Sequence, residues 1–248
     1  MSFANALSAA PPDPPIDVAL AQRQHAAYVA ALASLGLEIV AIPHDEACPD
    51  CCFVEDTVVT AGGRAVLTRP GAPSRRGEVE PVARALAKRI ELVRMEAPAT
   101  LDGGDCLRVG KTIYVGLSSR TNTAGITCLR DVFGPDGFTV VAVNMPPDVL
   151  HLKTVCSPLD DERVLVAQGT LPAATFGGAC VVSVPRQEAA AANVVAFGRT
   201  ALVAADGVRT AELVAQHGFR VVPVDTSELR KADGALSCLS VIVGARFR

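Results

Sequence analysis

Residues 106–143 read CLRVGKTIYVGLSSRTNTAGITCLRDVFGPDGFTVVAV and contain one complete unit of the predicted fold. Two short β-branched runs, at 106–109 and 113–117, flank a Gly-Lys turn and predict a β-hairpin. Helical spacing of apolar residues over 121–133 predicts an amphipathic helix, and the run 139–143 predicts a third strand. The unit therefore has the order strand, strand, helix, strand.

This order recurs along the chain about every 50 residues, which gives roughly four to five copies. A ring of such units is a coherent architecture, although the periodicity alone also allows an ordinary mixed α/β domain. No linker interrupts the pattern, so residues 1–248 are predicted to form a single domain. Further helices are predicted at 17–35, 77–89 and 208–217, and further strands at 37–42, 53–60, 65–68, 164–167, 194–197, 201–204, 219–224 and 239–243.

The composition excludes several classes of protein. The chain has 248 residues, a net charge of −3, 4% aromatic residues and no Trp, which argues against a nucleic-acid partner. Its longest apolar runs are far shorter than the roughly 20 residues that span a bilayer, so no membrane contact is expected. The N-terminus lacks a basic region followed by a long apolar stretch, which favours a cytoplasmic location.

Eight cysteines occur in the chain, and without a secretion signal we expect free thiols. Cys48, Cys51 and Cys52 have one spacing that zinc sites use, but no second Cys or His pair follows at a matching distance. Structural zinc is therefore not expected.

Two adjacent carboxylates, Glu55 and Asp56, interrupt the apolar run 53–59. Alternation along a strand would send them to opposite faces, so at least one should be buried. A buried carboxylate needs a cationic partner, and a guanidinium matches its geometry with paired N–H donors. The partner is either a ligand or an arginine of the protein itself.

A thiol, an imidazole and a further acid complete a candidate reaction centre. Asp102 precedes a Gly-Gly turn and could orient a histidine, for which His151 is the best candidate because apolar residues flank it. Taken singly, His151 and Cys238 are also consistent with ordinary packing residues. Together with the acids they indicate chemistry on a guanidinium.

Six motifs carry a resemblance to a known family and follow one another in that family's order. The chain resembles the dimethylarginine dimethylaminohydrolases, guanidino-group-modifying enzymes of the pentein superfamily. The resemblance implies a five-bladed α/β propeller of repeated ββαβ units with the active site in its central channel. It also implies that either the start of the chain is truncated or the first blade is incomplete, because the family usually begins with an additional N-terminal strand. The motifs are PDCCFVED (49–56), TRPGAPSRR (68–76), LDGGD (101–105), SRTN (119–122), LHLK (150–153) and DGALSC (233–238).

The same resemblance implies roles for individual residues. Cys238 would be the nucleophile, His151 the general acid and base, and Asp102 the residue that orients His151. Glu55 and Asp56 would bind the guanidinium of the substrate, with Asp50 as a further acid of the pocket. Arg75 and Arg120 would bind its α-carboxylate. The backbone carbonyls of Leu7 and Ala232, with Asp233 beside the latter, would face its α-ammonium group.

The implied reaction is hydrolysis of N-omega-methylated arginines to citrulline and dimethylamine or methylamine, through a covalent S-alkylthiouronium on the cysteine. Such a hydrolase of linear amidines needs no cofactor, although reversible inhibitory zinc at Cys238 is compatible with it. The expected partner is a small molecule, and the protein is expected to be a monomer or homodimer. Methylated arginines inhibit nitric oxide synthesis in animals, whereas a bacterium could use them as a nitrogen source.

Two alternatives remain open at this point. An arginine deiminase would use the same thiol and imidazole but would release ammonia. A noncatalytic binding module for cationic amino acids would use the acids alone, with Cys238 and His151 as packing residues.

Overall fold

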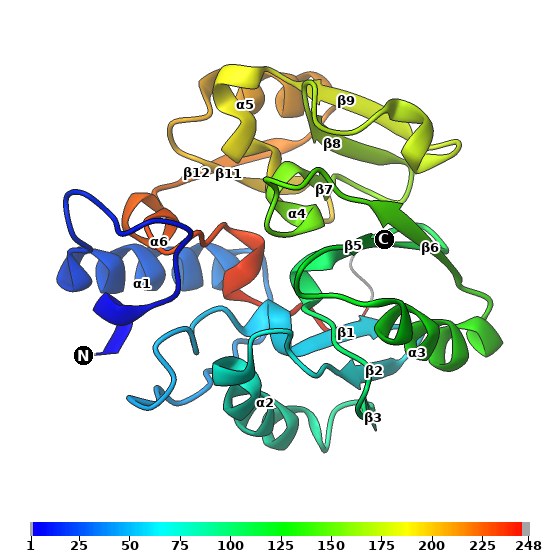
Figure 1. Ribbon diagram of the computed structural model, residues 1–248. Helices are drawn as coiled ribbons and strands as arrows, with labels where there is room; N and C mark the ends of the chain where they lie inside the picture. Colours follow the sequence, from blue (N-terminus) through cyan, green and yellow to red (C-terminus); the bar gives the residue numbers. More distant parts are fainter. Residues whose placement is uncertain (1, 245–248) are drawn as a thin grey trace.

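The computed structural model describes residues 2–244 and contains four three-stranded sheets arranged around a centre, with the longer helices on the outside (Figure 1). In each sheet two strands form an antiparallel hairpin, and the third strand joins the second in parallel. The third strand follows a crossover, which contains a helix in three of the four sheets. This is the unit predicted from the repeat.

The strands fall into four consecutive groups. They are β1 (Val58–Ala61), β2 (Arg64–Leu67) and β3 (Glu91–Arg94); β4 (Cys106–Val109), β5 (Thr112–Leu117) and β6 (Thr139–Asn144); β7 (Cys156–Pro158), β8 (Arg163–Ala167) and β9 (Cys180–Val184); and β10 (Val195–Phe197), β11 (Thr200–Ala204) and β12 (Arg220–Val224). The α-helices are α1 (Val18–Ser34), α2 (Val79–Leu86), α3 (Thr123–Phe133), α4 (Leu152–Val155), α5 (Val208–Gln216) and α6 (Ser227–Arg230).

Short 3-10 helices connect these elements, and several lie at the inner ends of the sheets. They are η1 (Ser2–Asn5), η2 (Val54–Thr57), η3 (Pro73–Glu78), η4 (Gly103–Asp105), η5 (Gly134–Asp136), η6 (Ala173–Phe176), η7 (Arg186–Ala192) and η8 (Ser237–Leu239).

The β4–β5 hairpin shows why the repeat forms. Its register pairs Cys106 with Val115 and Val109 with Thr112, so the turn contains only two residues. Gly110 has a φ of 56°, a value that favours glycine and suits this tight turn. On the sheet packs α3, whose Ile126, Leu129 and Phe133 are all at most 1% exposed. Each such side chain contributes roughly 1.5–3 kcal/mol through burial.

The fifth unit differs from the other four. Its helix, α1, packs against β12 and α6, but no hydrogen-bonded sheet accompanies it among residues 2–244. The strands predicted at 37–42 and 239–243 are therefore wrong, because neither segment has a partner for a ladder. Ile39 and Val40 remain 39% and 43% exposed. Residues 2–244 thus form four ββαβ-type units with sheets and a fifth unit without one.

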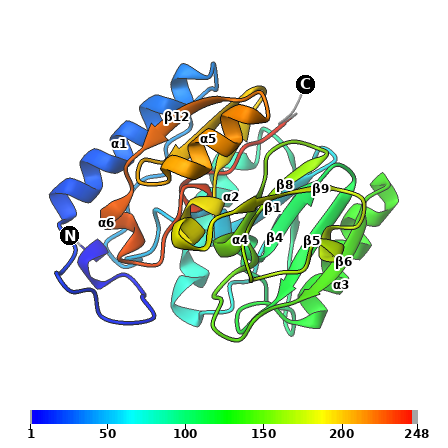
Figure 2. The same cartoon turned by 90° about the horizontal axis from the view of Figure 1, so that it is seen from above.

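The ribbon of α1 lies beside α6 and β12 (Figure 2). Side-chain hydrogen bonds connect α1 to the last quarter of the described chain and close the ring. The hydroxyls of Tyr28 and Ser240 lie 2.7 Å apart. Gln24 donates to Asp225 and Ser227, and its carbonyl oxygen accepts from the backbone of Glu228. None of the helices described is long and apolar enough to cross a membrane.

Candidate active site

Four short segments meet where the sheets approach the centre. Glu55 and Asp56 lie in η2, and Asp102 stands immediately before η4. His151 caps the N-terminus of α4, and Cys238 lies in η8. The expected strand over 53–60 begins only at Val58, so both carboxylates lie on a 3-10 turn instead of alternating along a strand.

His151 and Asp102 form the best-defined contact of the site. The His151 Nε2 atom lies 3.1 Å from Asp102 Oδ2, and their side chains are 8% and 0% exposed. Burial alone would lower the pKa of His151, but the charge of Asp56 and the hydrogen bond with Asp102 raise it to about 9. The free protein therefore carries an imidazolium here at neutral pH.

Asp56 faces the same imidazole from η2. Its Oδ1 accepts a hydrogen bond from the Gly104 amide at 2.8 Å, and its Oδ2 lies 2.5 Å from Arg75 Nη1. Burial opposes ionisation, yet the charges of His151 and Arg75 lower the pKa of Asp56 to about 2. A Cβ atom at Gly104 would lie 2.8 Å from both Asp56 Oδ1 and His151 Nδ1, so this close approach requires glycine.

Arg75 is only 4% exposed, and its guanidinium bonds three protein groups. It contacts Asp56, the carboxylate of Glu78 at 2.7 Å and the carbonyl oxygen of Phe53 at 3.0 Å. Asp56 therefore has an arginine of the protein as its partner, which was one of the two alternatives for these acids. Contact between Arg75 and a substrate carboxylate stays a prediction.

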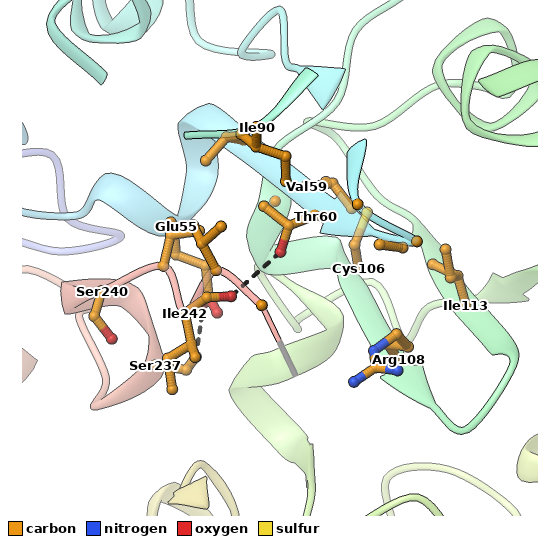
Figure 3. Close-up of a pocket in the computed structure, with 18 of the residues that line it drawn as sticks. Glu55, Val59, Thr60, Ile90, Cys106, Arg108, Ile113, Ser237, Ser240 and Ile242 are labelled. Atoms are coloured by element: carbon orange, nitrogen blue, oxygen red, sulfur yellow. Dashed lines mark hydrogen bonds between the residues drawn. The ribbon is translucent and has the colours of Figure 1, made fainter. Parts of the chain in front are cut away.

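Glu55 belongs to a second buried network. Its Oε1 lies 2.5 Å from Lys153 Nζ, and its Oε2 accepts from the Ser237 hydroxyl at 2.6 Å. All three residues line a cavity of about 510 Å³, in which Figure 3 shows Glu55 and Ser237. Lys153 and Ser237 were not assigned roles from the sequence. The only sequence signal for a role of these two residues was their position within the motifs LHLK and DGALSC.

Cys238 is half-buried in η8, where its backbone amide donates to Ala235. Burial raises the pKa of its thiol, and the carboxylates of Glu55 and Asp56 raise it further, against a smaller opposing effect of Lys153. The thiol is therefore neutral in the free protein. A cation bound among these acids would favour the thiolate.

Carboxylates hold the N-terminal segment, residues 2–16, against the same region. The Leu7 amide donates to Asp50 at 3.0 Å, and the Ala9 amide donates to Asp233 at 2.6 Å. Asp233 has a φ of 55°, a strained left-handed value outside glycine, and follows buried Ala232. The structure thus brings together four of the predicted substrate-binding positions.

Arg120 reaches the centre from the loop after β5. Its Nη1 lies 3.5 Å from Asp102 Oδ2, and its side chain remains 20% exposed. Fully buried Asp105 stabilises this loop by accepting from the hydroxyls of Ser118 and Thr121, and it also accepts from the amide of Leu152. Asp105 therefore links the Arg120 loop to the start of α4, a role that its sequence position did not reveal.

One group among the described residues has metal-ligand geometry: Asp56, Asp102 and His151. Cys238 is not a member of it, and neither are the cysteines at 48, 51 and 52. Because Arg75 and Gly104 already engage Asp56, this group is an ion-pair network with its positive charges supplied by protein.

The ring of ββαβ units, with a thiol, an imidazole and acids at its centre, defines a pentein of the guanidino-modifying class. A family profile described as N,N dimethylarginine dimethylhydrolase, eukaryotic, matches residues 13–241. The N(G),N(G)-dimethylarginine dimethylaminohydrolase of Pseudomonas aeruginosa is 37% identical over 91% of this chain and 89% of its own length. The enzyme of the same name from Streptomyces coelicolor is 42% identical over 91% and 87%.

Solved structures of related proteins have the same fold as this chain. The Pseudomonas aeruginosa enzyme, as a cysteine-to-serine mutant complexed with citrulline, superposes with a TM-score of 0.91 at 35% identity, covering 96% of this chain and 93% of that one. The N-terminal domain of a cyanobacterial arginine dihydrolase, at 18% identity and a TM-score of 0.81 over 91% and 87%, shows the shared fold alone. The chain belongs to the dimethylarginine dimethylaminohydrolase family, as its motifs predicted.

Proposed function

We propose that this protein hydrolyses N-omega-methylated arginines to citrulline and methylamine or dimethylamine. The observation that carries the proposal is the buried contact of 3.1 Å between His151 and Asp102. The charge of Asp56 acts on the same imidazole, and the neighbouring Glu55 bonds Ser237, the residue before Cys238. This arrangement can supply a proton, hold a cation and present a nucleophile. A binding module would need only the second of these.

Substrate binding activates the nucleophile. The guanidinium lies near Glu55 and Asp56, and Arg120 pairs with the α-carboxylate of the amino acid. Because the thiol of Cys238 is neutral in the free protein, the arriving positive charge promotes its ionisation, and the thiol proton passes to solvent because His151 is already protonated. The substrate thereby generates the thiolate that attacks it.

Two chemical steps follow. The Cys238 thiolate forms a C–S bond to the guanidinium carbon, protonated His151 gives its proton to the amine nitrogen, and the C–N bond breaks. A cationic S-alkylthiouronium and neutral amine result. Neutral His151 then takes a proton from water as its oxygen attacks the same carbon, the C–S bond breaks, and citrulline leaves as the cysteine is regenerated. Each proton transfer contributes about 10²- to 10⁴-fold in rate.

Relatives support this sequence of events. One solved structure of a cysteine-to-serine mutant contains citrulline, the product proposed here. Another is an adduct of a histidine-to-glycine mutant with S-methyl-L-thiocitrulline, and it superposes with a TM-score of 0.91 at 36% identity over 96% of this chain and 94% of that one.

A direct test measures citrulline released from asymmetric dimethylarginine, monomethylarginine and arginine. We expect turnover of the methylated substrates and loss of detectable turnover in Cys238→Ser, with retention of fold. The matched control is Cys180→Ser, which replaces an exposed thiol and should keep wild-type activity. Preference for unmethylated arginine would identify a deiminase, and binding without turnover would identify a binding module.

The proposal extends to the cofactor requirement, the cellular location and the oligomeric state of the enzyme. It assigns no cofactor, so a chelator should leave turnover unchanged, and it allows reversible inhibition by zinc at Cys238. It assigns a cytoplasmic location and a monomeric or homodimeric state. Cell fractionation and sedimentation measure these two properties directly.

A further inference from the structure

Asn193 is a buried polar residue to which the mechanism above assigns no role. It follows η7, at the entrance to β10, and is 2% exposed. Its side-chain amide nevertheless makes three hydrogen bonds, and all three go to segments that carry the proposed chemistry.

Two of these bonds hold the turn of the nucleophile. The backbone amide of Ser237, the residue before Cys238, donates to Asn193 Oδ1 at 2.9 Å. Asn193 Nδ2 donates to the Ser237 hydroxyl, also at 2.9 Å. That hydroxyl in turn donates to Glu55, so the bonds fix the start of η8 relative to a guanidinium-binding acid.

The third bond reaches the segment of the general acid. Asn193 Nδ2 also donates to the carbonyl oxygen of Lys153 at 2.8 Å, two residues after His151. One primary amide therefore spans the two chain segments whose reactive side chains must meet. An Asn has two N–H donors and one carbonyl acceptor, and here both kinds of group are in use.

We propose that Asn193 is a positioning residue, which sets the distance between Cys238 and His151 by joining the Ser237 turn to the Lys153 segment. The inference rests on the proposed function, since it concerns the approach of the proposed nucleophile to the proposed acid. Nothing in it requires Asn193 to touch the substrate. Displacement of a reacting group by about 1 Å can cost about 10²-fold in rate.

The neighbouring Ser157 provides a matched control. It is 0% exposed in β7, its hydroxyl donates to the carbonyl oxygen of Ala192, and it accepts from the amide of Val194. Ser157 thus holds the backbone on both sides of Asn193 but bonds neither Ser237 nor Lys153. The variant Ser157→Ala therefore shows how much activity is lost when the same loop is disturbed without breaking the bonds of Asn193.

The experiment compares Asn193→Ala, Asn193→Asp and Ser157→Ala with the wild type. It measures thermal unfolding, kcat and KM for asymmetric dimethylarginine, and the rate at which 2-chloroacetamidine alkylates Cys238. Asn193→Asp keeps the acceptor for the Ser237 amide but removes both donors, so it remains informative if Asn193→Ala does not fold.

We expect both Asn193 variants to lower kcat by about 10²-fold, with KM within about threefold, and to slow alkylation of Cys238. Ser157→Ala should lose stability while its kcat stays within about threefold. The proposal is overturned if folded Asn193 variants keep wild-type kcat and alkylation rate, or if Ser157→Ala reduces both as strongly. If the wild type releases no citrulline, the proposed function fails, and the alkylation rates still decide whether Asn193 positions the thiol.

Discussion

The acid–base group, consisting of Asp56, Asp102 and His151, and the N-terminal segment use carboxylates in opposite ways. In the acid–base group, buried acids bond a buried imidazole and shift its pKa to about 9. In the N-terminal segment, Asp50 and Asp233 accept from backbone amides that carry no charge. The first arrangement stabilises a protonation state, whereas the second holds a stretch of chain that can be released without separating two charges.

The largest difference should appear when Asp102 is replaced. Asp102→Asn keeps the shape of the side chain but removes the charge that stabilises the imidazolium, and its amide can present N–H toward Nε2. We expect kcat to fall by about 10²- to 10⁴-fold. Steady-state kinetics across pH, with thermal unfolding as the check on fold, measures the effect.

Asp131→Asn is the control, since it removes an exposed carboxylate from α3 and should leave kcat unchanged. A kcat for Asp102→Asn within about threefold of the wild type would contradict the role assigned to the acid–base group.

A smaller effect is expected on stability as a function of pH. The pKa of His151 is raised from 6.5 to about 9 on folding, so protonation favours the folded state. The stabilisation is complete below pH 6.5 and is lost as the pH rises through about 9, a change of roughly 3 kcal/mol at about 1.4 kcal/mol per pKa unit. Urea unfolding at a series of pH values measures it.

His151→Gln should flatten this dependence between pH 6.5 and 9, because the titrating group is gone. His217→Asn, which removes an imidazole at the C-terminal end of α5, is the comparison variant. Equal slopes for wild type and His151→Gln would show that the buried imidazole does not gain its proton on folding.

The smallest effect is expected at the N-terminal segment. Asp50→Ala removes the acceptor of the Leu7 amide, whereas Asp233→Asn keeps an oxygen and tolerates the left-handed φ of that position. We expect KM to rise by about three- to tenfold in Asp50→Ala and less in Asp233→Asn, with kcat nearly unchanged.

Amide hydrogen exchange distinguishes release of the segment from lost contact with substrate. The Leu7 amide should exchange faster in Asp50→Ala, and the Ala9 amide should do so in Asp233→Asn. Unchanged exchange at both amides would mean that these carboxylates do not hold the segment.

The repeated unit could be predicted because its signals are local. The strands at 106–109 and 201–204 appear almost as the alternation and glycine turns predict. The strands β3, β7 and β9 were not predicted from the sequence. The three residues of β7 include a proline, and the four residues of β3 have no clear alternation. The segments at 37–42 and 239–243 have the composition of strands but no partner, and composition cannot supply one.

The residues of the site were likewise predictable where the signal was local and unpredictable where it depended on a distant partner. Cys238, His151 and Asp102 could be selected through the family's motifs, which preserve residue type and order. The bond between Asp56 and Arg75, and the three bonds of Asn193, depend on distances between segments far apart in the chain. No single-sequence pattern reports such distances, so the network that supports the chemistry became visible only in the folded structure.

The hydrogen bond between Ser237 and Glu55 joins residues 182 positions apart. A nascent chain that has passed the histidine and every acid of the η2 turn still lacks its nucleophile. The thiol, the acids and the imidazole therefore come together only once the turn that carries Cys238 has been synthesised and the chain has folded. Premature termination shortly before that turn would leave a product unable to attack its ligand.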